Sequence, residues 1–342
     1  MYTFTNDYSE GAHPKILELM TKYNFEQNTG YGLDRHCEKA RELIRDWIDM
    51  PSADIHFIPG GTQTNLLVVS SFLRPHQCVI SADTGHINVH ETGAIEATGH
   101  KVVTVAGKDG KLTPESIQSA VDSHVGEHMV KPGMVYISNS TELGTIYTKA
   151  ELKSIRDCCL KNGLLLYMDG ARIGAALTSS INDLCIDEIA RLVDVFYIGG
   201  TKNGALFGEA LVICRDDLKE DFRYLMKQRA AMPAKGFVMG MQFEVLMRDG
   251  LYLELAEHAN AMAKEVADIF REKGYGFYAQ PCTNQVFPIL PDGLARKLMS
   301  QFGCQEIARI DERNTCIRFV TSWATRPESI GYLRAYLSGL TA

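Results

Sequence analysis

The sequence lacks the features that would place it in a membrane or on an export route. No apolar run approaches the ~20 residues that a helix needs to span a bilayer. The first residues, MYTFTNDYSEG, contain no basic region followed by an apolar stretch. There is also no low-complexity segment and no internal repeat. These absences predict a globular chain with no targeting segment and no membrane partner.

Cysteine pairing motifs are missing as well. The nine cysteines are an odd number, none forms a CxxC pair, and the adjacent Cys158 and Cys159 cannot easily bridge each other. Such a set is typical of a reduced chain and not of a secreted disulfide framework. We therefore expect a cytoplasmic protein.

The chain has no run of basic residues. Its 35 Lys and Arg residues against 42 Asp and Glu residues give a formal net charge of -7. This balance argues against nucleic acid or an acidic membrane surface as a partner, so local groups must hold any anionic ligand. The length of 342 residues, 45% of them hydrophobic, allows a sizeable core and about two domains.

From about residue 55 the sequence alternates between apolar, strand-like runs and helix-like stretches. Thr113 followed by Pro114 is typical of a helix start, and Asn162 followed by Gly163 of a helix end. The expected strands are IHFIP (55–59), CVIS (78–81), KVVTV (101–105), MVYIS (134–138), LLLYMD (164–169), VFYIGG (195–200) and EALVICR (209–215). This order predicts an α/β fold in which helices cover both faces of a mainly parallel sheet.

After Arg215 the pattern changes to long helical stretches, broken at 231–236 and 272–277. Only two clear strands follow, NQVFPIL (284–290) and CIRFV (316–320). We therefore assign residues 1–244 to an N-terminal segment with a large α/β domain, and residues 245–342 to a small C-terminal α+β domain.

The segment PGGTQTN (59–65) places two glycines between an expected strand and an expected helix. Glycines let backbone N–H groups approach a ligand closely, and a helix N-terminus favours an anion such as a phosphate. The segment has neither the terminal Lys-Ser/Thr of a nucleotide P-loop nor the GxGxxG of a dinucleotide site. A plain strand-to-helix turn is the alternative.

Two charged residues stand at the ends of neighbouring expected strands, Asp169 in YMDGARI and Lys202 in YIGGTKNG. A parallel sheet would bring both to the same rim. An amine that is partly desolvated there becomes a nucleophile toward a carbonyl, whereas a solvated turn lysine is the alternative. A lysine, a carboxylate and a phosphate-binding turn on one rim are the groups that pyridoxal 5'-phosphate requires.

Seven segments taken in order resemble one known group of enzymes. They are FTNDYSEG (4–11), GYGLDRHCEKA (30–40), PGGTQTNL (59–66), GHINVHETGA (85–94), YMDGARI (167–173), TKNGALFGEAL (201–211) and RFVTSWAT (318–325). The set resembles the low-specificity L-threonine aldolase branch of the beta-eliminating lyase family of fold-type-I pyridoxal phosphate enzymes. The likeness covers nearly the whole chain and implies the fold-type-I, transferase-like architecture.

The resemblance implies a cofactor site. In it, Lys202 matches the lysine that binds pyridoxal 5'-phosphate covalently, and Asp169 matches the partner of the pyridine nitrogen. The further cofactor residues that it implies are Arg172 near the ring hydroxyl, His86 stacked on the ring, and Gly61 and Thr62 around the phosphate.

The resemblance also implies a substrate site that contains Ser9, Tyr31 and Arg318. Arg318 would grip the carboxylate of an amino acid at two points, which a lysine cannot do. Tyr31 would come from the neighbouring subunit, which implies a homo-oligomer with a dimer as its minimal unit and a tetramer as the expected assembly.

The remaining candidate residues lie in less specific patterns. His86 and His90 have the i, i+4 spacing of two zinc ligands, but the order is HxxxHE, not HExxH, and no third ligand is evident, so we favour ring stacking and predict no metal site. His128 is a candidate acid–base and substrate residue, with a solvated loop as the alternative. Whether Arg229 or Lys235 contacts the phosphate stays open.

The implied activity is a carbon–carbon lyase reaction. It would cleave L-threonine, L-allo-threonine and other β-hydroxy amino acids to glycine and an aldehyde, with His86, His128 or a bound water as the base. The alternative is another reaction of the same cofactor, namely β-elimination, racemisation or transamination, since one fold supports them all. A non-catalytic chain and a zinc hydrolase are more distant alternatives.

Overall fold

The computed structural model describes residues 2–340. Its centre is a seven-stranded sheet of order β1-β7-β6-β5-β4-β2-β3. The strands are β1 (Asp54–Ile58), β2 (Gln77–Ala82), β3 (Val102–Val105), β4 (Lys131–Ser138), β5 (Leu165–Asp169), β6 (Val195–Gly199) and β7 (Glu209–Ile213). Only β7 runs antiparallel to its neighbours in this sheet; the other neighbouring pairs are parallel. The predicted mainly parallel sheet is confirmed.

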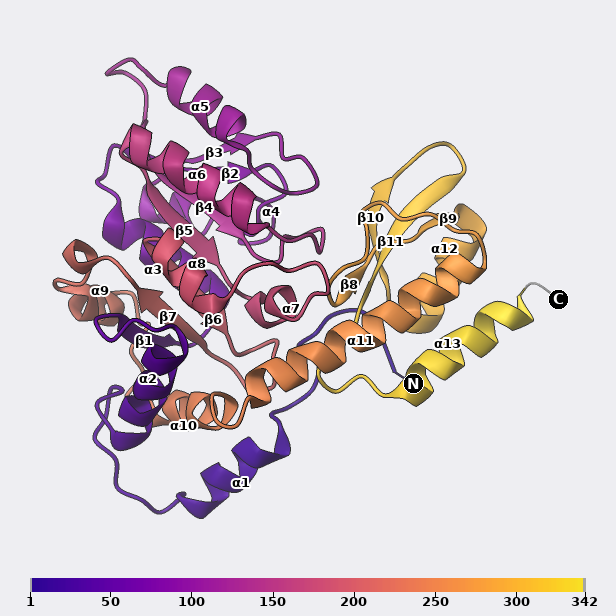
Figure 1. Ribbon diagram of the computed structural model, residues 1–342, viewed down its shortest axis with the longest axis horizontal. Coiled ribbons are helices and arrows are strands. Elements are labelled where there is room, and N and C mark those ends of the chain that lie inside the picture. Colours follow the sequence, from indigo (N-terminus) through magenta and orange to yellow (C-terminus); the bar gives the residue numbers. More distant parts are fainter. Residues whose placement is uncertain (1, 341–342) are drawn as a thin grey trace.

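Side chains of the central strands alternate between two apolar cores, one on each face of the sheet. In β4, Val135 and Ile137 join one core, whereas Met134 and Tyr136 join the other. The first core packs against α1 (Pro14–Lys22), α2 (Arg35–Trp47), α5 (Pro114–Asp122), α6 (Lys149–Asn162), α7 (Ile173–Leu177), α8 (Ile186–Leu192) and α10 (Phe237–Leu246). The second packs against α3 (Gly61–Phe72), α4 (His86–Val89) and α9 (Phe222–Gln228). Helices therefore cover both faces, as predicted (Figure 1).

Local signals explain where several helices begin and end. Thr148 and Glu151 form a reciprocal capping box at the start of α6, and Gly163 ends that helix in the left-handed conformation, with φ of 64°. Thr113 and Ser116 cap α5 in the same way. Two short 3-10 helices, η1 (Glu96–Thr98) and η2 (Asp216–Leu218), complete this part of the chain.

The long helix α11 (Leu251–Glu272) joins the large sheet to a smaller C-terminal layer (Figure 1). Its first turns pack into the first core, and its last turns pack into a third core with α12 (Asp292–Phe302) and α13 (Pro327–Gly339). Phe4 is fully buried in this third core, so the start of the chain packs against its C-terminal part. The division at residue 245 stays a prediction.

The C-terminal sheet has more strands than the two that the sequence predicts. It consists of β8 (Gln285–Val286), β9 (Ile289–Pro291), β10 (Gln305–Arg309) and β11 (Asn314–Val320). The first three strands each pair antiparallel with β11. The expected single strand at 284–290 is split into β8 and β9 around Phe287 and Pro288, since proline cannot donate to a strand ladder. β10 escaped notice because it is an edge strand with largely exposed, polar side chains.

Candidate active site

Three neighbouring strands present a tyrosine two residues before they end. Tyr136 on β4 is paired with Tyr167 on β5, and Ser138 is paired with Asp169 two residues further along. Tyr197 stands on β6, two residues before Gly199. Because residues two apart point to the same face of a strand, Asp169 lies among these phenol groups at the carboxyl rim of the sheet.

The Asp169 carboxylate is buried and accepts four hydrogen bonds. Oδ1 accepts from the Tyr197 hydroxyl at 2.6 Å and from the Ala171 N–H at 3.0 Å. Oδ2 accepts from the Tyr136 hydroxyl at 2.7 Å and from the Asn65 side-chain amide at 3.2 Å. Burial acts to raise the pKa of Asp169, but His86 and these hydrogen bonds outweigh it and hold the pKa below its usual value. Asp169 is therefore a fixed negative charge at neutral pH.

The tyrosines and Asn65 are not among the site residues that the sequence predicts. A signal was present, since a tyrosine occurs at the same offset in three successive strands, MVYIS, LLLYMD and VFYIGG. Each of the three follows directly on apolar residues. Their burial is indeed complete, but hydroxyl groups in a core need partners, and two of the three are donors to Asp169.

The N-terminus of α3 opens at the same rim. Thr64 donates its N–H to the Gly60 carbonyl at 2.9 Å, so the N–H groups of Gly61, Thr62 and Gln63 precede the first intrahelical donor. A Cβ on Gly61 would lie only 3.2 Å from the Tyr197 hydroxyl, so glycine keeps this approach clear. The arrangement is a suitable anion site.

Lys202 lies in a tight loop between β6 and β7. Gly200 and Thr201 both donate their N–H groups to the Gly208 carbonyl at 3.1 Å, which closes the loop. Within residues 2–340, the Lys202 amine forms no hydrogen bond or ion pair. Burial lowers the pKa of Lys202, and the Arg172 charge acts in the same direction. The side chain is therefore an available amine with a raised neutral fraction.

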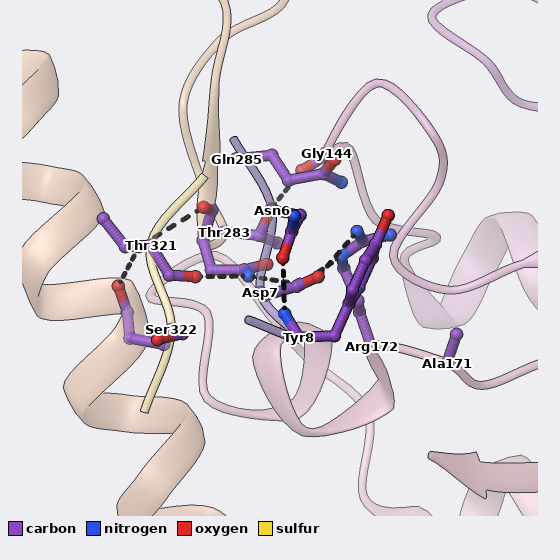
Figure 2. A network of polar contacts seen from close by, with 12 residues as sticks. Asn6, Asp7, Tyr8, Gly144, Ala171, Arg172, Thr283, Gln285, Thr321 and Ser322 are labelled. Atoms are coloured by element: carbon purple, nitrogen blue, oxygen red, sulfur yellow. Dashed lines mark hydrogen bonds and ion pairs between the residues drawn. The ribbon is translucent and has the colours of Figure 1, made fainter. Parts of the chain in front are cut away.

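Arg172 is held by an acidic residue from the start of the chain. Asp7, which is 1% exposed, accepts from Arg172 Nε at 2.6 Å and from Nη2 at 3.1 Å. The Asn284 amide also donates to Asp7 Oδ2, at 2.9 Å, and to the Thr321 carbonyl. Figure 2 shows Asp7 reaching Arg172 from the N-terminal segment, next to strands of the C-terminal sheet. Asp7 therefore links three parts of the chain, and sequence analysis gave no sign of it.

His86 begins α4, and its ring is oriented by a buried acid. Its Nδ1 lies 2.7 Å from Glu91 Oε1, and the Glu91 side chain is fully buried. The Asn65 amide donates to the same Glu91 oxygen, also at 2.7 Å, and so joins this pair to Asp169. The His86 ring therefore has a fixed orientation.

These groups surround one cavity of about 340 Å³. Its wall includes Lys202, Asp169, Arg172, His86, Gly61 and Thr62, together with Tyr8, Asn65, Glu142, Tyr197 and Glu209. The volume is within the usual range for a small-molecule site. All six cofactor residues that the sequence predicted thus lie around one cavity, although their roles stay predictions.

Comparison with known proteins places this geometry in a family. A family profile described as beta-eliminating lyase matches residues 6–292. The chain belongs to that family. The low specificity L-threonine aldolase of a Pseudomonas species is 30% identical over 340 residues, covering 97% of this chain and 96% of the relative.

Solved structures agree with this assignment. A threonine aldolase of Leishmania major is 49% identical, with a TM-score of 0.98 over the whole of both chains. An aspartate aminotransferase of Thermus thermophilus, 13% identical, shares only the fold, with a TM-score of 0.70 over 96% of this chain and 88% of the other. The expected family and the fold-type-I architecture are confirmed.

Members of the beta-eliminating lyase family are pyridoxal phosphate enzymes, and the donor set in the cavity fits that cofactor. The Lys202 amine has no partner to displace within residues 2–340, and the first N–H groups of α3 can receive a phosphate. Asp169 already has four donors, but two are phenol hydroxyls whose hydrogens can turn to other acceptors, which would free a carboxylate lone pair for a protonated ring nitrogen.

The predicted substrate residues lie outside the wall of this cavity. Ser9 is exposed and donates to the Asn6 side chain, and Tyr31 lies beside Lys227, whose amine is 4.5 Å from the tyrosine ring centre. Arg318, on β11, donates through Nη2 to Gln305 at 2.6 Å, while its buried Nε has no partner within residues 2–340.

The structure places His128 far from Asp169. His128 is exposed in the loop that leads into Lys131, the first residue of β4, whereas Ser138 at the other end of β4 pairs with Asp169. Lys235 is also exposed, and the Arg229 carbonyl accepts a hydrogen bond from the Gln63 side chain on α3 at 3.0 Å. None of the three lines the cavity.

The structure also bears on a metal or membrane function. The rings of His86 and His90 are 5.5 Å apart, but His86 Nδ1 is already engaged by Glu91. No group of three or more His, Cys, Asp or Glu side chains in the described part of the chain is arranged to hold a metal ion. No helix between residues 2 and 340 has the length and apolar character needed to cross a membrane.

Proposed function

We propose that this protein is a pyridoxal phosphate-dependent lyase that cleaves L-threonine or L-allo-threonine to glycine and acetaldehyde. The observation that carries the proposal is the Lys202 amine, which has no hydrogen-bond or ion-pair partner within residues 2–340 and shares one cavity with Asp169, a carboxylate whose lowered pKa favours its charged form. The similarity to threonine aldolases along nearly the whole chain supports Cα–Cβ cleavage over the other reactions of this cofactor.

Five parts of the site would hold the cofactor. Lys202 would bind it covalently, Asp169 would pair with the ring nitrogen, and the N–H groups of Gly61 and Thr62 would receive the phosphate. His86 would cover one ring face, and Arg172 would lie near the ring hydroxyl. When bound, the cofactor withdraws electrons from the Cα of an amino acid.

The protein residues then have separate tasks. The lowered pKa of Lys202 makes its amine available to bond and to be displaced, and the charge of Asp169 keeps a proton on a nitrogen placed beside it. Arg318 would bind the substrate carboxylate at two points, and its unpartnered Nε leaves a donor for this task. Ser9 would contact the same substrate.

We further propose a homo-oligomer, with a dimer as the minimal unit and a tetramer as the assembly. Phe25 and Leu33 are 96% and 60% exposed in the segment that also carries Tyr31, which fits an apolar surface covered by a second copy. Tyr31 would reach the neighbouring cavity. Size-exclusion chromatography with light scattering tests the assembly.

The nine cysteines are all unpaired, which fits a cytoplasmic location.

Two measurements test the main proposal. Borohydride reduction of the protein with bound cofactor, followed by peptide mapping, should leave the pyridoxyl group on Lys202; finding it on another lysine refutes the assignment. Incubation with L-threonine should release glycine and acetaldehyde in equal amounts. Formation of 2-oxobutanoate and ammonia, or amino transfer that depends on an added keto acid, would show a different reaction on the same cofactor.

A further inference from the structure

Three carboxylates line the cavity, and they differ in which of their oxygens are free. Asp169 has two donors on each oxygen. Glu209 accepts from the Gly200 N–H at 2.9 Å on one oxygen and from the Thr201 hydroxyl at 2.8 Å on the other. Both oxygens of Glu209 thus hold the loop that carries Lys202.

Glu142 is the exception. Its Oε1 accepts from the His86 N–H at 2.9 Å and from the Ser138 hydroxyl at 2.7 Å. Its Oε2 forms no hydrogen bond with any residue between 2 and 340, and it is not enclosed by the protein. Glu142 therefore presents one anchored oxygen and one accessible oxygen at the cavity.

The anchoring groups fix where this carboxylate lies. Ser138 ends β4 next to Asp169 on β5, and His86 begins α4; both line the cavity, and both donate to the same Glu142 oxygen. Glu142 itself belongs to the loop that follows β4, so a flexible loop side chain is held at the same rim as Lys202 and Asp169. In the proposed function, other residues hold the cofactor, and Glu142 is not one of them.

The surroundings of Glu142 suit proton transfer. Burial raises the pKa of Glu142 and the nearby charge of Asp169 acts in the same direction, while hydrogen bonds from Ser138 and His86 oppose them. A carboxylate whose pKa is raised toward neutrality is a stronger base than an ordinary one and can also return the proton. Asp169 is less suited to this role, because each of its oxygens already accepts two hydrogen bonds and its pKa is lowered.

We propose that Glu142 is the catalytic residue that accepts the proton of the substrate β-hydroxyl during Cα–Cβ cleavage. This inference rests on the proposed function. In the step, Glu142 Oε2 takes the hydroxyl proton, the former O–H electron pair forms the second carbon–oxygen bond of the aldehyde, and the Cα–Cβ bond breaks with its electron pair left on Cα. Cα then takes up one proton, which gives glycine, and Glu142 releases the one it accepted.

Glycine provides the internal control, because it has no β-hydroxyl. Each variant of the enzyme with bound cofactor is assayed for threonine cleavage and, in D2O, for exchange of the glycine α-proton by NMR. Glycine affinity is measured from the absorbance change on binding. We expect Glu142→Gln to lower kcat for cleavage by about 100-fold or more, the usual contribution of a general base, while glycine exchange and affinity stay near those of the unmodified enzyme.

The outcomes separate this inference from the function on which it rests. If the unmodified enzyme cleaves threonine but Glu142→Gln reduces cleavage and glycine exchange equally, or reduces neither, the inference is wrong. If the unmodified enzyme releases no glycine and aldehyde, the proposed function itself fails. Glu142→Asp serves as a second variant if the glutamine variant does not fold: its shorter carboxylate should also impair cleavage selectively, and an equal loss of both reactions would overturn the inference.

Discussion

Replacing Asp7 by asparagine removes a negative charge from a buried ion pair without changing the shape of the side chain. The Arg172 guanidinium, 13% exposed, would then keep its charge with no opposite charge in contact. Loss of one partner of a buried pair costs about 3–5 kcal/mol. We therefore expect Asp7→Asn to be among the most destabilising single substitutions in the chain, although Asp7 lies in an irregular segment near the N-terminus.

This cost converts to a temperature shift that calorimetry can measure. An unfolding entropy of about 2.1 cal/mol/K per residue gives roughly 0.7 kcal/mol/K for 342 residues, so the expected decrease in Tm at pH 7 is about 4–7 °C. The pKa of Asp7 is lowered in the folded state, because Arg172 and Lys202 outweigh its burial. Its stabilisation is therefore complete above the usual value of 3.8 and is lost as the pH falls through the folded-state pKa. The difference between the two proteins should shrink below about pH 4.

The matched control is the surface pair of Arg215 and Asp217. It is also bidentate, with distances of 2.6 and 2.7 Å, but its side chains are 46% and 58% exposed. Exposed pairs contribute about 0–1 kcal/mol, so Asp217→Asn should change Tm by no more than about 1–2 °C. If the two substitutions lower Tm equally, burial is not the source of the Asp7 effect and the reasoning above fails.

Three further substitutions test the active site. Asp169→Asn should still bind pyridoxal phosphate but lower kcat by a factor on the order of hundreds, or about 3 kcal/mol of barrier; near-normal turnover would remove Asp169 from the mechanism. Tyr197→Phe removes one hydrogen-bond donor to the buried Asp169 carboxylate, which should lower the free energy of unfolding by about 1.5–3 kcal/mol and raise the pKa of Asp169. Calorimetry should show a lower Tm, and an unchanged Tm would contradict the expected loss. Arg318→Lys should retain the cofactor's colour and sharply reduce kcat/KM for amino acids, since a point charge replaces a two-point grip; loss of the cofactor would instead indicate a structural role.

The sheet and the Lys202–Asp169 pair could be predicted because their signals are local. Leu164 to Tyr167 form an apolar run that can only be a buried strand in this context, and the ends of parallel strands share a rim whatever the loops do. Positions such as Lys202 therefore follow from the order of strands and helices along the chain. The glycine turn at Gly61 follows from the same order, whereas Arg172 and His86 were implied only by the resemblance to the family.

The remaining parts depend on contacts between distant segments. Asp7 and Arg172 are 165 residues apart, and nothing in the sequence around Asp7 announces the pair. Glu142 stands in a loop whose path is set by Ser138 and by the His86 backbone. Local reasoning could not decide between a site residue and a solvated loop for His128, because only the fold shows that its loop enters β4 from the end that lies away from Asp169.

The charges around Lys202 explain why Asp7 matters beyond stability. Arg172 lowers the pKa of Lys202, whereas Asp7, Asp169 and Glu209 raise it, and burial dominates them all. Because Asp7 contacts Arg172 directly, it compensates the charge that acts most strongly on Lys202 and also places that charge beside the cavity. Asn284 ties Asp7 to the Thr321 carbonyl at the end of β11, the strand that carries Arg318. One buried acid therefore acts on the charge balance at Lys202 and is hydrogen-bonded, through Asn284, to the residue that follows the strand of Arg318.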